Sequence, residues 1–165
     1  MNIIALVIME AIIGCFIVLI ACVIGIANGP EGLACFYESE VHERIVKLGI
    51  TTTEKIKKNG NRFKLFGILP FFVLMIAAVY GINGARTFFD GFWQMCVILL
   101  TEGLFDRLFI DYYWVGKTKA WVITGTEDLR PYIYGKTLVS KWVGTVVGYP
   151  LIAAVISAIA AFFIK

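Results

Sequence analysis

The chain has little charge for its size. Charged residues make up 16% of its 165 positions, whereas an ordinary soluble domain has about 25%. Hydrophobic residues make up 59% and occur in long blocks, which a soluble core of this size could not cover. The net charge is only +3, and no basic run is interleaved with aromatic residues, so we expect no nucleic acid among the partners. These scarcities indicate an integral membrane protein.

The motifs of soluble enzymes are also missing. The sequence has no phosphate loop, no G-x-G-x-x-G, no G-x-S-x-G and no cluster of histidine with cysteine. Its four cysteines form no CxxC, and Cys15 and Cys22 lie in an apolar stretch where cysteine usually packs as a small hydrophobe. His42 is the only histidine and falls among charged residues. The sequence therefore names no cofactor, and any metal site is unknown.

Four apolar segments are long enough to cross a bilayer, which takes about 20 residues. They cover residues 3–27, 65–83, 88–112 and 142–164. The first is longer than the hydrophobic region of a signal peptide and has no basic residue before it, so we expect a permanent span. The predicted fold is all-α: a four-helix transmembrane bundle that forms a single domain over residues 1–165.

The basic residues predict the orientation of the bundle. Most of the 15 lysines and arginines lie between the first and second spans or between the third and fourth, whereas the short connection between the second and third has only Arg86. The positive-inside rule places both long connections in the cytoplasm and both termini outside. We therefore expect a multi-pass protein of the cell membrane, with the lipid bilayer as its first partner.

Both long connections are predicted to carry structure of their own. Over residues 32–48, apolar residues recur every three to five positions, which predicts an amphipathic interfacial helix in the first cytoplasmic loop. A basic piece over residues 53–58 ends at Asn59-Gly60, and its lysines would lie against anionic headgroups. Aromatic residues after the third span indicate either an aromatic belt at the membrane interface or a wall around a ligand site.

The third span contains four charged residues, Glu102, Asp106, Arg107 and Asp111, in the half nearer the predicted cytoplasm. Each charge costs roughly 2.5–3.5 kcal/mol near the centre of a bilayer. With the α-helical period, Glu102 and Asp106 share one face, and Arg107 and Asp111 share another. The second pair has opposite signs and can neutralise itself, whereas the first pair has like signs.

The like-signed pair requires a partner, and three are open. A bound cation or a retained proton would make a functional site. A basic side chain from a loop would instead make a structural charge network, and Lys117, Lys119 and Arg130 are nearest in sequence. We expect a ligand-binding pocket lined by the four charged residues of the third span, with Lys117, Lys119 and Glu127 at its mouth.

Glu10 is a further acid inside a predicted span, about two turns from the start of the first. It lies too far along the membrane normal to share a metal ion with Glu102. A proton or ion path that uses both acids is a hypothesis, which Glu10→Gln would remove if transport or ligand binding were unchanged.

Gly144 and Gly148 have GxxxG spacing in the fourth span. Small residues at this spacing let helix backbones approach closely. The pattern predicts packing within the chain or, as the alternative, a seam to a second copy or to another membrane partner.

Three resemblances follow from these motifs. The run from Glu102 to Asp111, with its Asp106-Arg107 step, resembles the lipoprotein signal peptidases, which would imply an intramembrane aspartyl protease. Two features of that family are missing from this sequence: the Asn-x-Gly-Ala-type stretch and the Asn before the Asp-Arg step. The Asp-rich end of the third span, followed by the turn over residues 125–127 (Gly-Thr-Glu), resembles an uncharacterised group of small bacterial polytopic membrane proteins, which implies a bacterial source and no activity. The order of span, long loop and span is similar to that of the glutathione-transferring membrane enzymes, whose Arg- and Asn-bearing stretch is not matched by residues 59–62.

The sequence thus favours a small membrane protein that binds or moves a cation, a proton-coupled solute or a lipid headgroup, with transport as the broad class. A membrane-embedded enzyme acting on a lipid or lipoprotein is one alternative, for which Asp106→Asn would abolish turnover without unfolding the protein. An accessory or assembly subunit of a larger membrane complex is the other, and it would tolerate the same change.

Overall fold

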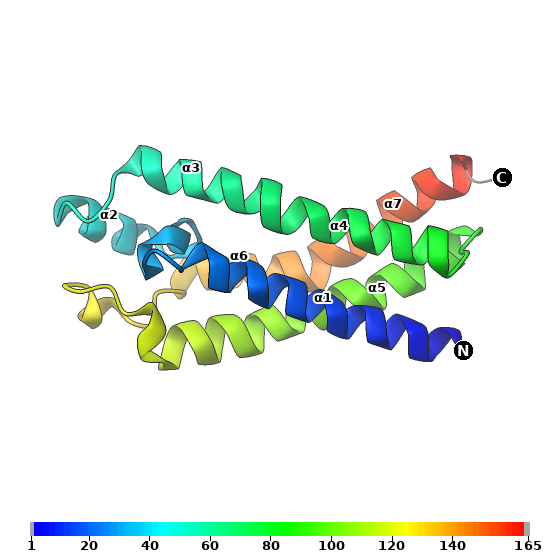
Figure 1. Cartoon of the computed structure of the whole chain (residues 1–165), viewed down its shortest axis with the longest axis horizontal. Helices are drawn as coiled ribbons and strands as arrows, with labels where there is room; N and C mark the ends of the chain where they lie inside the picture. Colours follow the sequence, from blue (N-terminus) through cyan, green and yellow to red (C-terminus); the bar gives the residue numbers. More distant parts are fainter. Residues whose placement is uncertain (1, 164–165) are drawn as a thin grey trace.

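Four long helices run side by side in the computed structural model, which describes residues 2–163 (Figure 1). They cover Ile3–Gly25, Thr53–Ile82, Phe88–Val115 and Gly135–Phe163, and each is long and apolar enough to cross a membrane. The first helix begins and the fourth ends at the same end of the bundle (Figure 1). The predicted all-α transmembrane bundle is confirmed, and its four apolar helices agree with a multi-pass membrane protein.

Two of the helices begin earlier than the predicted spans. The second starts at Thr53 instead of residue 65, and the fourth starts at Gly135 instead of residue 142. Asn59 and Gly60 therefore lie inside a helix and do not end one. Hydropathy locates the part of a helix that contacts lipid, whereas the polar first turns continue into water beyond it. Residue 164, the last of the predicted fourth span, lies outside the described residues.

Each long helix except the first is divided by wide π-helical turns, in which the backbone bond runs from residue i to i+5. The α-helical parts are α1 (Ile3–Gly25), α3 (Thr53–Phe63), α4 (Leu69–Ile76), α5 (Phe88–Phe105), α6 (Gly135–Val143) and α7 (Tyr149–Phe163). The π-helical parts are Lys64–Ile68, Ala77–Ile82, Asp106–Val115 and Gly144–Gly148. The segment Asp106–Val115 matters most, because it contains Asp106, Arg107 and Asp111.

α5 is the central helix of the membrane part. It packs along both α1 and α7, whereas the second and fourth long helices have little contact with each other. Close approach at α5 depends on Gly91, since a Cβ there would collide with the hydroxyl of Tyr80 and lie 3.1 Å from Oγ of Ser157. The Tyr80 hydroxyl donates a hydrogen bond to Ser157 Oγ at 3.1 Å. The second and fourth helices are thus joined mainly through α5.

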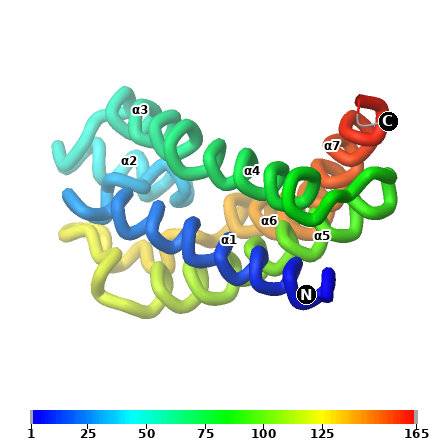
Figure 2. The backbone as a smooth tube through the Cα atoms, turned by 45° about the vertical axis from the view of Figure 1, so that its right-hand side comes forward, coloured from blue at the N-terminus to red at the C-terminus, as the bar shows by residue number. Residues whose placement is uncertain are grey.

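A folded cap covers the basic end of the bundle, on the left in Figure 2. It contains a 3-10 segment at Pro30–Phe36, the helix α2 (Ser39–Lys47) and the connection over residues 116–134. The amphipathic helix predicted over residues 32–48 is present only as α2, because the preceding residues to Phe36 form the 3-10 segment. The apolar residues Val41 and Ile45 of α2 are fully buried in one core with Trp121 and Tyr132. Protein therefore covers the apolar face of α2.

Glu38, which directly precedes α2, ties the cap to the fourth long helix. Its Oε2 accepts a hydrogen bond from the backbone N–H of Thr137 at 3.0 Å, in the first turn of α6. Hydrogen bonding to the Thr137 side chain and to its backbone N–H holds the pKa of the Glu38 carboxyl below its usual range. An ionised carboxylate at this position also complements the positive end of the helix dipole.

Replacing Gly91 by leucine tests the packing at α5. We expect Gly91→Leu to lower the free energy of unfolding by about 1–3 kcal/mol or more, because the side chain has no space beside Tyr80 and Ser157. Thermal unfolding of the purified protein in detergent measures the change. Gly81→Leu is the control, since nothing lies within 4 Å of a Cβ at that position. Equal losses in both variants would contradict the packing described here.

Candidate functional site

Arg107 is the centre of a buried charge network in the third long helix. Its side chain is 6% exposed, and its Nη2 donates a hydrogen bond to the carboxylate of Asp106. Its Nη1 lies 2.6 Å from Oδ2 of Asp111, whose side chain is 5% exposed. From the fourth helix, Nζ of Lys141 donates a hydrogen bond to Oδ1 of Asp111 at 2.7 Å. Two acids and two bases therefore neutralise one another across the third and fourth helices.

The π-helical turn explains why the network differs from the predicted pairs. Arg107 and Asp111 form the expected ion pair. Glu102 and Asp106 keep the α-helical spacing, since the backbone N–H of Asp106 donates to the carbonyl of Glu102, and Asp106 in addition binds Arg107, which the helical period did not predict. In a π-helix residue i lies roughly below i+5, so Asp106 and Asp111 come to the same side of the helix with Arg107 between them.

Glu102 takes no part in the ion pairs of this network. It is 3% exposed, and among residues 2–163 no basic side chain lies within 4 Å of its carboxyl. Its neighbour is Tyr149 of α7, whose ring packs against Gly103 and whose hydroxyl lies beside the Glu102 carboxyl. The site thus combines a neutralised ion network with one separate carboxyl group.

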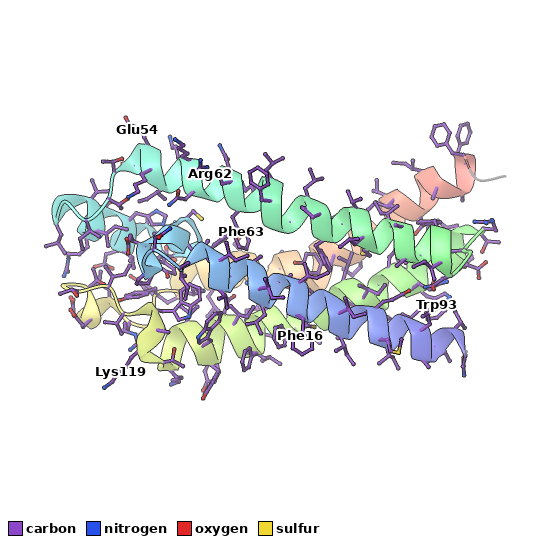
Figure 3. All side chains as sticks on the ribbon, in the orientation of Figure 1. Phe16, Glu54, Arg62, Phe63, Trp93 and Lys119 are labelled. Carbon is purple, nitrogen blue, oxygen red and sulfur yellow. The ribbon has the colours of Figure 1, made fainter. Side chains whose placement is uncertain are left out.

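The three residues that we expected at the mouth of the site lie elsewhere. Nζ of Lys117 lies 5.3 Å from the ring centre of Tyr112, and Lys119 is exposed and points away from the bundle (Figure 3). Glu127 accepts a hydrogen bond from the backbone N–H of Gly125 at 2.9 Å in an exposed turn. The connection that carries them folds into the cap, so sequence proximity to Asp111 does not bring them to it.

Arg130, the third basic residue that we considered as a partner for the acids, caps the end of the third helix. Its Nη2 donates to the carbonyl oxygens of Val115, Gly116 and Thr118 at 3.2, 3.0 and 2.8 Å. These carbonyls lack partners within the helix, and an arginine satisfies them well. The basic residue that does reach the acids is Lys141, which we had assigned to the loop. Hydropathy does not place Lys141 inside a helix, because α6 begins six residues before it, at Gly135, in a polar stretch of the sequence.

A cavity of about 260 Å³ lies against the charge network. All four residues of the network line it, and so does Glu102. The remaining wall is apolar and comes from all four long helices and the cap, with Val18, Cys22, Phe63, Phe71, Phe72 and Trp121 among its residues. Figure 3 shows Phe63 pointing from α3 toward the interior of the bundle. The cavity therefore has a charged side and an apolar side.

The cavity opens between the second and fourth long helices. Of its lining residues, Ile68 in the second helix is 36% exposed and Gly144 in the fourth is also exposed. Nothing lies within 4 Å of a Cβ placed on Gly144. These two helices have little contact with each other. The opening faces the lipid-exposed side of the bundle.

One nitrogen of Arg107 has no partner in the network. Its Nε is fully buried without a hydrogen-bond partner among the described residues, whereas its Nη1 and Asp111 Oδ2 face each other at 2.6 Å in the ion pair. Unsatisfied buried polar atoms are costly and uncommon in native proteins. A ligand group that accepts a hydrogen bond would satisfy Arg107.

Glu10 belongs to a different cluster at the other end of the bundle. Nδ2 of Asn83 donates to Glu10 Oε2 at 2.9 Å and to Gln94 Oε1 at 2.8 Å. None of these three residues lines the cavity. The cavity that Glu102 lines thus does not extend to Glu10, and the ion path through both acids stays a hypothesis.

The aromatic residues of the third connection fall into two groups. Tyr112 and Tyr113 are exposed, as residues of an interfacial belt are. Trp121 and Tyr132 are buried in the cap, and Trp121 lines the cavity. Tyr112 and Tyr113 therefore remain candidates for a belt, and Trp121 remains a candidate for the wall of a ligand site.

The comparisons with known proteins give no relative. No family model, no curated protein and no solved structure matches the chain. The arrangement of the acids also speaks against the aspartyl-protease resemblance. Two catalytic aspartates must face a shared water molecule or proton, whereas Arg107 lies between Asp106 and Asp111 and binds both.

A double-mutant cycle tests the link between the third and fourth helices. We expect Asp111→Asn to cost about 3–5 kcal/mol in free energy of unfolding, because it leaves Arg107 and Lys141 buried without their shared acid. Adding Lys141→Met should restore more than about 1 kcal/mol of that loss. Chemical unfolding in detergent measures each corner of the cycle.

The exposed pair Arg44–Asp128, at 3.2 Å, provides the matched control. Its coupling free energy should lie below about 1 kcal/mol, because water screens it. Coupling no stronger between Asp111 and Lys141 than between Arg44 and Asp128 would show that the buried ion pair does not join the helices.

Proposed function

We propose that the protein binds an amphipathic, lipid-like molecule, with the polar group of the ligand at Arg107 and Glu102 and its apolar chain in the rest of the cavity. One observation carries this proposal: a cavity inside the transmembrane bundle that is charged on one side, apolar on the other and open toward lipid. Of the three ligand classes that the sequence favoured, this selects the lipid headgroup.

The distribution of charge makes a cation a poorer fit. Asp106 and Asp111 already interact with Arg107 and Lys141, so their oxygens are not free to replace the hydration shell of an ion. Among the described residues no three side chains of the His, Cys, Asp and Glu types group together as metal ligands would. Only Glu102 remains, and one carboxyl group is a weak cation site.

The polar atoms on the cavity side define the headgroup. The buried Nε of Arg107 offers a hydrogen-bond donor, which suits a phosphate, carboxylate or carbonyl oxygen. Glu102 offers an acceptor, which suits an amine or a hydroxyl group. A headgroup with both functions, such as a zwitterionic phosphoethanolamine group, satisfies both residues and brings no net charge to a site that is almost neutral.

The size of the cavity requires the ligand chain to extend into the membrane. At about 260 Å³, it is slightly smaller than the range of roughly 300–1,000 Å³ for small-molecule sites. It holds a headgroup and the first part of a chain, and the opening beside Ile68 and Gly144 lets the rest pass between the helices. With the positive-inside orientation in the cell membrane, the bound molecule belongs to the cytoplasmic leaflet.

A leucine at Gly144 tests the proposal by blocking the opening. The probe is a phosphatidylethanolamine with a photoactivatable diazirine in its acyl chain, present in vesicles that contain the purified protein. We expect crosslinks beside the opening in the native protein, and about tenfold fewer in Gly144→Leu, because the new side chain occupies the path of the chain. Peptide mass spectrometry measures the sites and their yield.

Gly148→Leu is the matched control, since it adds the same side chain one turn away, also with nothing within 4 Å, but outside the cavity lining. Its crosslinking should equal that of the native protein. Equal yields in both variants, or crosslinks spread evenly over the lipid-exposed surface, would refute the proposal. Crosslinks lost in Gly144→Leu but never located near the cavity would indicate a protein or lipid contact on the glycine face instead.

A further inference from the structure

The basic residues at the capped end of the bundle divide into those with protein partners and those without. Arg44 pairs with Asp128 at 3.2 Å, Arg130 caps the third helix, and Lys141 binds Asp111. Within the described residues, no carboxylate lies within 4 Å of any lysine of α2, of α3 or of the π-helical turn that follows α3. The structure of the cap therefore accounts for the first group and leaves the second unexplained.

Three of the unpaired lysines line one groove between α2 and α3. The groove has a volume of about 800 Å³ and takes Lys47 from α2, Lys57 from α3 and Lys64 from the π-helical turn that follows. Ser39 and Asn61 add polar groups that donate hydrogen bonds. The other polar lining residues are His42, Glu43 and Thr53, so Glu43 is the one acid in the described lining.

The groove lies at the level where the helix enters the lipid. Lys64 is followed at once by Leu65 and Phe66, which are 53% and 74% exposed and begin the apolar surface of the second span. Lys57 lies seven residues earlier, or about 10 Å along the helix axis at 1.5 Å per residue. Lys64 thus lies at the inner edge of the headgroup layer and Lys57 near or just beyond its outer edge, since this layer is about 5–8 Å thick on each side of the hydrocarbon core.

This groove is separate from the cavity inside the bundle. Phe36 is the only residue in the described linings of both. Its ring packs edge-on against Phe63, with a centroid distance of 5.1 Å, and Nζ of Lys141 lies 5.5 Å from its centre on the cavity side. A ligand in the groove therefore contacts none of the charged residues of the proposed lipid site.

We propose that the groove is a second binding site, for a phosphate-bearing group, and that it takes this group from an anionic phospholipid of the adjoining leaflet. Lysine ammonium groups bind phosphate as point charges, and hydroxyl and amide donors complete its hydrogen bonding. A soluble phosphate compound shares this chemistry. The position of Lys64 beside the lipid-exposed surface favours the lipid source.

Native mass spectrometry of the detergent-purified protein tests this site with phosphatidylglycerol as the probe. Each lysine near an anionic surface strengthens binding about fivefold, so Lys57→Gln with Lys64→Gln should weaken the tightest bound phosphatidylglycerol by about 25-fold. The matched control is Lys55→Gln with Lys58→Gln, which removes the same charge from the same helix outside the groove. We expect a change of less than about twofold in the control.

Two further arms identify the source of the phosphate. Phosphatidylcholine should bind weakly and equally to all variants, and glycerol 3-phosphate should compete poorly with phosphatidylglycerol. If glycerol 3-phosphate binds as tightly as the lipid and depends on Lys57 and Lys64, the ligand is soluble and the lipid assignment is wrong. Equal losses in the two double variants would mean general attraction to a basic surface, which refutes the site.

Folding of the variants is checked by their thermal midpoints, which should match the native value because these lysines are exposed and unpaired. Lys47→Gln gives an independent measurement from α2. It should weaken phosphatidylglycerol binding about fivefold, as one lysine of the groove. An unchanged affinity in this variant would remove α2 from the site and overturn the proposal of a groove between two helices.

Discussion

The burial of Arg107 is the constraint on which the other features of this protein depend. An isolated charge inside a bilayer is costly, so the chain must supply opposite charges within hydrogen-bonding distance. Asp106 and Asp111 on the same helix supply these opposite charges, and Lys141 on the fourth helix pairs with Asp111 in turn. The network fixes the position of the fourth helix relative to the third. It also forms the charged side of the cavity.

The cap has a similar structural consequence. Its core buries Val41, Ile45, Trp121 and Tyr132 in a small folded unit outside the apolar spans. The segment Pro30–Phe36 lies between this unit and the membrane part, where Leu33 and Phe36 close the cavity on that side. As a result, Phe36 lines both the cavity inside the bundle and the groove between α2 and α3. Each has its own opening and its own set of charges.

Each prediction from the sequence succeeded or failed for a physical reason that can be traced to particular residues. Length and hydropathy predicted all four spans, because a helix in lipid must satisfy its backbone within itself. The residues of the third span were recognised from the cost of burying charge. The α-helical period predicted the pair of Arg107 with Asp111, and the structure adds Asp106 to this pair at the π-helical turn Asp106–Val115. Lys141 was missed because its helix begins in polar sequence. The predicted mouth residues were wrong because the connection carrying them folds into the cap.

The sequence by itself determined that the chain is a helical membrane protein, that its basic residues gather at one end, and that the third span contains charge that must be neutralised. These properties follow from composition and from the period of a single helix. Only the tertiary structure decided which charges meet, because Lys141 lies 30 residues from Asp111 and reaches it through helix packing. It also decided that Glu102 stays without a basic partner and that the second and fourth helices leave an opening between them. Contacts between distant segments depend on the packing of whole helices, which no local pattern contains.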